Sequence, residues 1–168
     1  MDTKLEQEFL AAHDAFAEAL FRHCYFRVHD RERAKDLVQE AFYRTWVYLA
    51  EGKEIRNLRA FLYKVSNNLI IDEARRKQPL SLETLTEEGF SPKDESLPDA
   101  EQRLIGEEIN KKLLLLEEPY RTAIIMRFFD ELSPKEIALA LNLSQNTVSV
   151  RIHRGLKKLE EIAGPGFK

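Results

Sequence analysis

A run of polar and basic side chains near the C-terminus has the composition of a nucleic-acid contact surface. Its candidate contact residues are Asn146, Thr147, Ser149, Val150, Arg151, His153, Arg154, Lys157 and Lys158. No acidic residue occurs between Ile137 and Leu159, so the basic members carry a net positive charge that can neutralise phosphates. The amide, hydroxyl and imidazole members can form hydrogen bonds with base edges. Contact with DNA requires a structural element that presents the basic residues and the hydrogen-bonding residues on the same face.

The preceding residues predict that element as two short helices around a tight turn. Ser133 can cap the first helix, Pro134 suits its first position, and Glu136 completes a capping box. Asn142 is placed at the turn, because asparagine tolerates the left-handed conformation better than most residues. Ser144 then caps the second helix. The pattern predicts a helix-turn-helix whose second helix carries the basic residues.

The second helix has one apolar face. On a helical wheel, Ile152, Gly155 and Leu159 lie within about 40° of Val148, so this stripe is expected to pack inward. The contact residues fall on the opposite face or beside it. An ordinary amphipathic terminal helix with a solvated basic face is the alternative. We favour DNA reading because the capping box, the turn, the apolar stripe and the missing acids agree.

Composition predicts an all-helical protein of two small domains. The chain has 168 residues, 43% hydrophobic content and few glycines and prolines, and helical spacing recurs along it. Residues 77–98 combine prolines, serines and acids, which predicts a flexible acidic linker. We therefore expect an N-terminal domain at 1–76 and a C-terminal domain at 99–168 that contains the helix-turn-helix.

Five further helices are predicted, at about 3–29, 31–50, 57–76, 99–116 and 118–130. The helix at 31–50 has an apolar stripe at helical spacing, and its outer face carries Asp36, Gln39, Glu40 and Tyr43. The helix at 57–76 is expected to expose Lys64, Asn67, Asn68, Arg75 and Arg76, close to the aromatic Phe61. Asparagine pairs are poor helix formers, so a pair in mid-helix suggests a function such as base contact.

Other classes of function find little support in the sequence. Cys24 is the only cysteine, which excludes an internal disulfide, and it is not spaced with the four histidines like a zinc site. No nucleophile and base set, phosphate loop or cofactor motif is recognisable, so an enzyme is remote and no metal or cofactor is expected. No apolar run is long enough to span a membrane and no signal peptide is recognisable, which favours a cytoplasmic protein.

Three motifs in this order resemble the extracytoplasmic-function sigma factors of the sigma-70 superfamily. They are the segment from Asp36 to Trp46, the segment from Phe61 to Arg76, and the terminal helix-turn-helix. The resemblance covers nearly the whole chain. It implies a factor that binds core RNA polymerase, recognises the −10 and −35 promoter elements and directs initiation with promoter melting.

The resemblance also implies roles for the candidate residues. Asp36, Gln39, Glu40 and Tyr43 match the helix that binds the β′ clamp of core polymerase, whose β flap is the second implied contact. Phe61, Lys64, Asn67, Asn68, Arg75 and Arg76 match the −10 element-binding helix, and the loop 51–57 matches one that captures a flipped base. The polar and basic set from Asn146 to Lys158 matches the −35 reader. An anti-sigma factor would be a further partner, although nothing in the sequence identifies one.

The chain departs from the family pattern at several positions. Ser149 and Leu156 stand where many relatives have basic residues, which predicts an altered −35 preference and a weaker phosphate grip. Phe61 replaces a common tryptophan, and Asn142 replaces the usual turn glycine. A freestanding helix-turn-helix regulator, which would bind duplex DNA as a dimer without polymerase, stays open as an alternative.

Overall fold

The computed structural model describes residues 3–76 and 108–164, and every regular element in these ranges is helical. The first range contains α1 (Thr3–Val28), α2 (Arg31–Ala50) and α3 (Leu58–Arg76). The second contains a helical stretch at 108–114, then α6 (Glu118–Ile124), the π-helix η1 (Ile125–Phe129), α7 (Pro134–Leu141) and α8 (Gln145–Ala163). The all-helical prediction is confirmed. The linker predicted at 77–98, and the start of the helix predicted at 99–116, lie outside the described residues.

Local signals set the boundaries of the N-terminal helices close to the predicted ones. The α1 helix ends at Val28, because His29 adopts a left-handed conformation with φ of 56°. Asp30 then caps α2 by accepting a hydrogen bond from the Arg33 amide at 3.2 Å. The Asn57 side chain accepts one from the Ala60 amide at 3.0 Å and so fixes the start of α3.

The helix predicted at 118–130 differs from a regular α-helix. Its last turn is wound as η1, in which the Asp130 amide donates to the Ile125 carbonyl at 3.0 Å, five residues back. Glu131 follows with φ of 55°, and the Leu132 amide closes the turn on the Met126 carbonyl at 3.0 Å. This wide turn leaves Asp130 buried against α1. Helix propensity does not distinguish the two windings, and so the sequence did not predict it.

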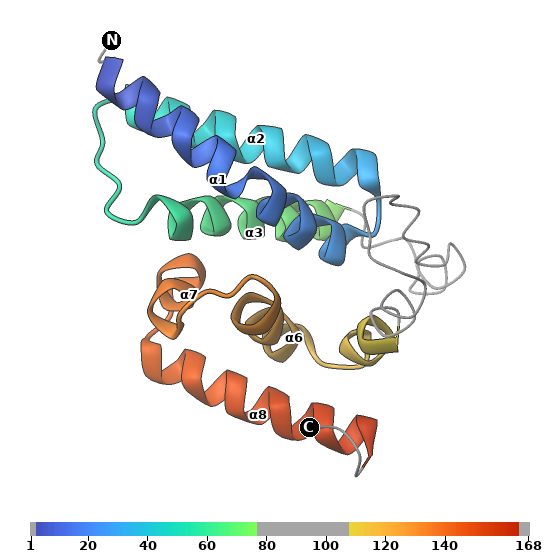
Figure 1. Ribbon diagram of the computed structural model, residues 1–168. Coiled ribbons are helices and arrows are strands. Elements are labelled where there is room, and N and C mark those ends of the chain that lie inside the picture. Colours follow the sequence, from blue (N-terminus) through green and yellow to red (C-terminus); the bar gives the residue numbers. More distant parts are fainter. Residues whose placement is uncertain (1–2, 77–107, 165–168) are drawn as a thin grey trace.

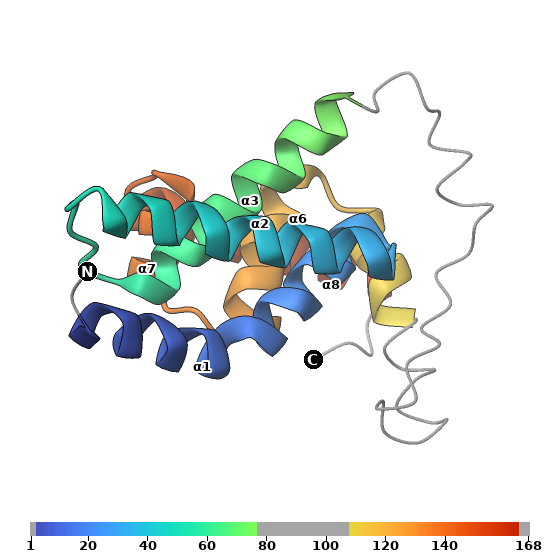
Figure 2. The same cartoon turned by 90° about the horizontal axis from the view of Figure 1, so that it is seen from above.

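The helices form two layers that pack on one another (Figure 1). The N-terminal layer consists of α1, α2 and α3, and the C-terminal layer consists of α6, η1, α7 and α8. The α3 helix lies against α7, and α8 is on the outer side of the C-terminal layer. The view in Figure 2 shows the N-terminal layer crossing over α6, α7 and α8.

The main hydrophobic core extends across both layers. Leu20, Leu62 and Tyr63 from the first layer belong to the same buried cluster as Met126 and Ile137 from the second. A second, smaller cluster lies within the C-terminal layer and contains Leu113, Leu116, Ile124, Ile125 and Leu159. The two predicted domains are therefore joined through a continuous core.

Candidate nucleic-acid interface

The helix-turn-helix has the local geometry that its sequence predicted. The Glu136 amide donates to Ser133 Oγ at 3.1 Å, and the Ser133 amide donates to Glu136 Oε1 at 3.2 Å, which completes the capping box. Asn142 occupies the left-handed region with φ of 55° and ψ of 49°. Ser144 caps α8 by accepting from the Thr147 amide at 3.1 Å. These interactions fix the angle between α7 and α8.

The inner face of α8 packs against α6. Val148, Gly155 and Leu159 are buried and Ile152 is half-buried, as the wheel predicted. A Cβ atom on Gly155 would lie 3.0 Å from Cγ1 of Ile124, closer than side chains normally approach. The glycine therefore permits the close approach of α8 to α6. This approach sets the position of the outer face of α8 relative to α6.

The outer face of α8 presents most of the predicted contact residues to solvent. The exposed members are Asn146, Ser149, Val150, His153, Arg154 and Lys157, and the half-buried members are Thr147, Arg151 and Lys158. Among residues 3–76 and 108–164, neither Arg151 nor Arg154 forms an ion pair with a carboxylate. Both guanidinium groups are thus available for phosphate.

Two predicted contact residues are partly engaged within the protein. The Lys158 Nζ atom lies 3.4 Å from Glu117 Oε1 and 4.9 Å from the centre of the Tyr120 ring. The Thr147 hydroxyl lies 2.8 Å from the Ser144 hydroxyl. The contact between the two hydroxyls stabilises the start of α8. The contacts of Lys158 stabilise the packing of α8 against the start of α6. We therefore expect these two residues to position the helix more than they read sequence.

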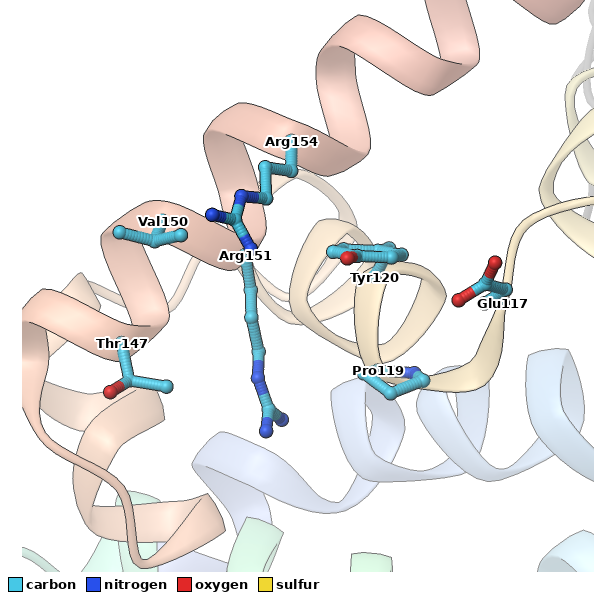
Figure 3. Close-up of a pocket in the computed structure, with 7 residues that line it drawn as sticks. All are labelled: Glu117, Pro119, Tyr120, Thr147, Val150, Arg151 and Arg154. Carbon is cyan, nitrogen blue, oxygen red and sulfur yellow. The ribbon is translucent and has the colours of Figure 1, made fainter.

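A shallow groove of about 270 Å³ runs between α8 and the start of α6 (Figure 3). It is lined by Glu117, Pro119, Tyr120, Thr147, Val150, Arg151 and Arg154. In Figure 3 the Arg151 side chain extends from α8 along the groove, and the Arg154 side chain runs back along α8 toward Arg151 and Val150. The positive charge of these two arginines suits a nucleic-acid backbone. Glu117 and Tyr120 were not predicted as site residues, because their contact with α8 depends on tertiary packing.

The candidate −10 residues on α3 are distributed over several sides of the helix. Asn68, Arg75 and Arg76 are exposed, and Phe61 and Lys64 are half-buried. The Phe61 ring packs on Tyr48 of α2 with centroids 4.8 Å apart, beside the loop at 51–57. Tyr48 is therefore a further aromatic side chain at this surface. The sequence did not predict this role, because the contact of Tyr48 with Phe61 depends on how α2 and α3 pack.

Asn67 is the exception, and its expected exposure is wrong. Its side chain is only 4% exposed and its Oδ1 atom accepts a hydrogen bond from Arg27 at 2.9 Å. The adjacent Asn68 points to solvent, so the two amides lie on different sides of the helix. The sequence suggested exposure because asparagine is rarely buried without a partner. Here the partner is supplied by α1, forty positions away.

The predicted polymerase-binding residues lie on one accessible surface of α2. Asp36, Gln39 and Tyr43 are exposed and Glu40 is half-buried, with a contact of 2.7 Å from its Oε1 to Arg44. A groove of about 290 Å³ follows this surface and continues onto the end of α3. Its walls are Arg33, Asp36, Leu37, Glu40, Arg44, Leu69, Asp72, Glu73 and Arg76. The surface is rich in charges of both signs.

Two sequence families match this chain. The model of Sigma-70 region 2 matches residues 13–79, and that of Sigma-70 region 4 matches residues 106–159. The ECF RNA polymerase sigma factor SigW of Bacillus subtilis is 33% identical over 158 residues, which cover 88% of this chain and 84% of SigW. The chain belongs to the extracytoplasmic-function sigma factors. A second relative, the ECF sigma factor SigL of Mycobacterium tuberculosis, is 30% identical over 154 residues, covering 89% of this sigma factor and 85% of SigL.

Solved structures support the fold of this sigma factor. The sigma factor RpoE of Bartonella quintana, in complex with the anti-sigma factor NepR, matches with a TM-score of 0.70 and 21% identity over 96% of this chain and 98% of RpoE. CnrH, in complex with the cytosolic domain of CnrY, matches with a TM-score of 0.69 and 21% identity over 94% and 88% of the two chains. Sigma factors are transcription initiation factors rather than catalysts. No helix in the described ranges is both long enough and apolar enough to cross a membrane.

Proposed function

We propose that this sigma factor binds core RNA polymerase through α2 and recognises two promoter elements through α3 and α8. The outer face of α8 carries the proposal for the −35 element, because its polar residues are exposed and Arg151 and Arg154 form no ion pair with a carboxylate of residues 3–76 or 108–164. A helix in the major groove reads bases with side chains near its N-terminus and grips phosphates with those at its sides. Asn146, Ser149, Val150 and His153 are the proposed readers.

On this proposal, α3 and the loop at 51–57 act on the −10 element. Phe61 packs on Tyr48 at the start of α3, and Asn68 is exposed further along the same helix, so α3 offers both aromatic and amide groups. Such groups suit contacts with unstacked bases. Extruding a base from the duplex costs a few kcal/mol, and binding of the extruded base in a pocket can offset this cost and so drive local melting without ATP. Arg75 and Arg76, both exposed, are proposed to hold the DNA backbone.

Core polymerase is proposed to contact Asp36, Gln39, Glu40 and Tyr43 through the β′ clamp, and the C-terminal layer is proposed to meet the β flap. An anti-sigma factor is a further proposed partner, supported by the similar sigma factor RpoE, which was solved in complex with the anti-sigma factor NepR. A freestanding regulator is the competing function. It would bind a single operator as a dimer and would need no polymerase.

Run-off transcription with core polymerase and a promoter library tests the proposal. The wild-type chain should support initiation from a subset of promoters and sediment as a monomer without DNA. Asp36→Lys combined with Glu40→Lys should weaken polymerase binding by about tenfold or more, because charge complementarity controls encounter and pairing. The control is Glu8→Lys with Glu18→Lys, which makes the same charge change on the exposed surface of α1. Equal polymerase affinity of the two double variants would contradict the assignment of α2.

A further inference from the structure

Glu117 places a carboxylate beside the basic surface of α8. It directly precedes α6, and its backbone carbonyl accepts hydrogen bonds from the amides of Tyr120 and Arg121 at 3.1 and 3.0 Å. Its side chain, however, makes no capping hydrogen bond. The Lys158 ammonium donates to Glu117 Oε1 at 3.4 Å instead. The carboxylate is therefore engaged with a lysine that was predicted to contact DNA, and not with its own helix.

The same carboxylate lines the groove between α8 and the start of α6 (Figure 3). Among the described residues that line this groove, Glu117 is the acidic one, and Arg151 and Arg154 are the basic ones. Neither arginine forms an ion pair with any carboxylate in the part of the chain that the structure describes. A DNA backbone that approaches the two arginines therefore also meets the negative charge of Glu117, which repels phosphate.

The Tyr120 ring holds the Lys158 ammonium at the edge of the groove independently of Glu117. The Nζ atom lies 4.9 Å from the centre of the ring, within the range of a cation–π contact. If the carboxylate lost its charge, this contact would still keep the ammonium close to α6. Its donors would then be available to phosphate, which lysine binds as a point charge.

The ion pair is weak enough for DNA to compete with it. The Glu117 side chain is 70% exposed and the Lys158 side chain 43%, so water and salt screen their attraction. A phosphate can replace the carboxylate, but this exchange gives less than the capture of an unpaired lysine would. A lysine that neutralises a phosphate adds about 0.9 to the slope of log affinity against log salt. Because Glu117 already neutralises it, Lys158 should add less.

We propose that Glu117 sets the affinity of the −35 interface, because its carboxylate competes with DNA phosphate for Lys158. This inference rests on the proposed function, since α8 must approach a DNA backbone for the competition to occur. Phosphate contacts carry no sequence information, so Glu117 lowers the affinity for all duplexes alike. Contacts with base edges then supply a larger share of the binding energy, and the sigma factor dissociates faster from DNA that lacks a promoter.

A purely structural role of Glu117 predicts the opposite sign. If the ion pair served only to hold α8 against α6, Glu117→Gln would loosen the recognition helix and weaken DNA binding. Competition for Lys158 predicts that the same substitution strengthens DNA binding. The sign of the change in affinity therefore distinguishes the two roles.

Fluorescence anisotropy with the full-length protein measures this change. Two labelled duplexes of equal length and composition are used, one selected by the wild-type chain from a randomised −35 library and one with the selected sequence shuffled. Glu117→Gln should bind both duplexes roughly threefold to fivefold more tightly and raise the salt slope by up to about one unit. The control is Glu131→Gln, the same charge change at an exposed residue that does not line the groove. It should change the affinity by less than about 1.5-fold, because salt screens distant exposed charges.

Lys158→Ala tests whether the gain depends on the lysine. In the wild-type background this substitution should reduce the salt slope only slightly. In the Glu117→Gln background it should reduce the slope by about one unit, because the freed lysine then contacts phosphate fully. Glu117→Gln should accordingly give little gain once Lys158 is alanine. Circular dichroism verifies that all variants remain helical.

Three results would overturn the inference. They are an unchanged or lower affinity of Glu117→Gln, an equal gain in Glu131→Gln, and a gain that persists in the Lys158→Ala background. The proposed function fails in a different way. A wild-type chain that binds the selected and shuffled duplexes equally would contradict −35 recognition, whereas the comparison of Glu117→Gln with its controls would still stand. Absence of binding to either duplex in every variant at low salt would contradict both proposals.

Discussion

The two helices proposed to read DNA, α3 and α8, differ in how much of their surface is packed against other helices. The α3 helix packs on α1 and α2 on one side and on α7 on the other, which leaves a narrow exposed strip that includes Asn68. The α8 helix packs mainly on α6 and α7, and its outer face is exposed. A helix with one packed face separates structural from functional residues cleanly. In a helix with two packed faces this separation is lost. Some of its polar residues are then exposed for DNA contact, and others are buried in the packing.

The largest expected effect tests the packed side of α8. Gly155→Val places a branched side chain where even a Cβ would be 3.0 Å from Ile124. Overpacking of this kind should lower the free energy of unfolding by about 3 kcal/mol. Urea unfolding followed by circular dichroism measures it. Ser149→Val, on the exposed face of the same helix, should change stability by less than about 0.5 kcal/mol. Similar losses in both variants would mean that α8 has no distinct inner face.

The next prediction compares the two neighbouring asparagines of α3. Asn68→Ala should relax the preference for −10 sequence by roughly 1 to 3 kcal/mol, as expected for a lost base contact. Asn67→Ala should leave that preference unchanged, because its amide is bound to Arg27. It should instead lower stability by about 1 kcal/mol. Permanganate footprinting on consensus and mismatched −10 sequences measures the sequence preference of each variant, and thermal unfolding measures its stability. Equal footprints for Asn68→Ala and wild type would reduce Asn68 to a structural role.

The sequence predicted most accurately the parts that are determined locally. The capping box at Ser133, the left-handed Asn142 and the cap at Ser144 all depend on neighbours within a few residues, and all were confirmed. The bounds of α2 were also predicted, because an N-cap and a regular apolar stripe define them. The exposed residues of α8 followed from the single apolar stripe.

The parts that the sequence did not predict depend on contacts between distant residues. Asn67 is buried because Arg27 reaches it from α1, and Asp130 is buried because His23 lies across the interface. Neither partner can be identified from spacing along one helix. The same holds for Tyr120, which meets Lys158 of α8. The polar contacts between the layers, such as that of Arg27 with Glu118, have no local signature, because their charged residues resemble an ordinary solvated surface in sequence.

The smallest expected effects distinguish two adjacent lysines on the outer side of α8. Lys157 is exposed, so Lys157→Ala should weaken binding to −35 duplexes about equally across sequences and reduce the slope of log affinity against log salt by about one unit. Lys158 is held by Glu117 and the Tyr120 ring, so Lys158→Ala should reduce the slope by less. Fluorescence anisotropy at several salt concentrations measures both slopes, and a randomised −35 library verifies that sequence preference is unchanged. A larger change in the salt slope for Lys158→Ala than for Lys157→Ala would show that DNA displaces Glu117 from Lys158. The surface of α8 that contacts DNA would then be larger than the exposed face of the unbound protein.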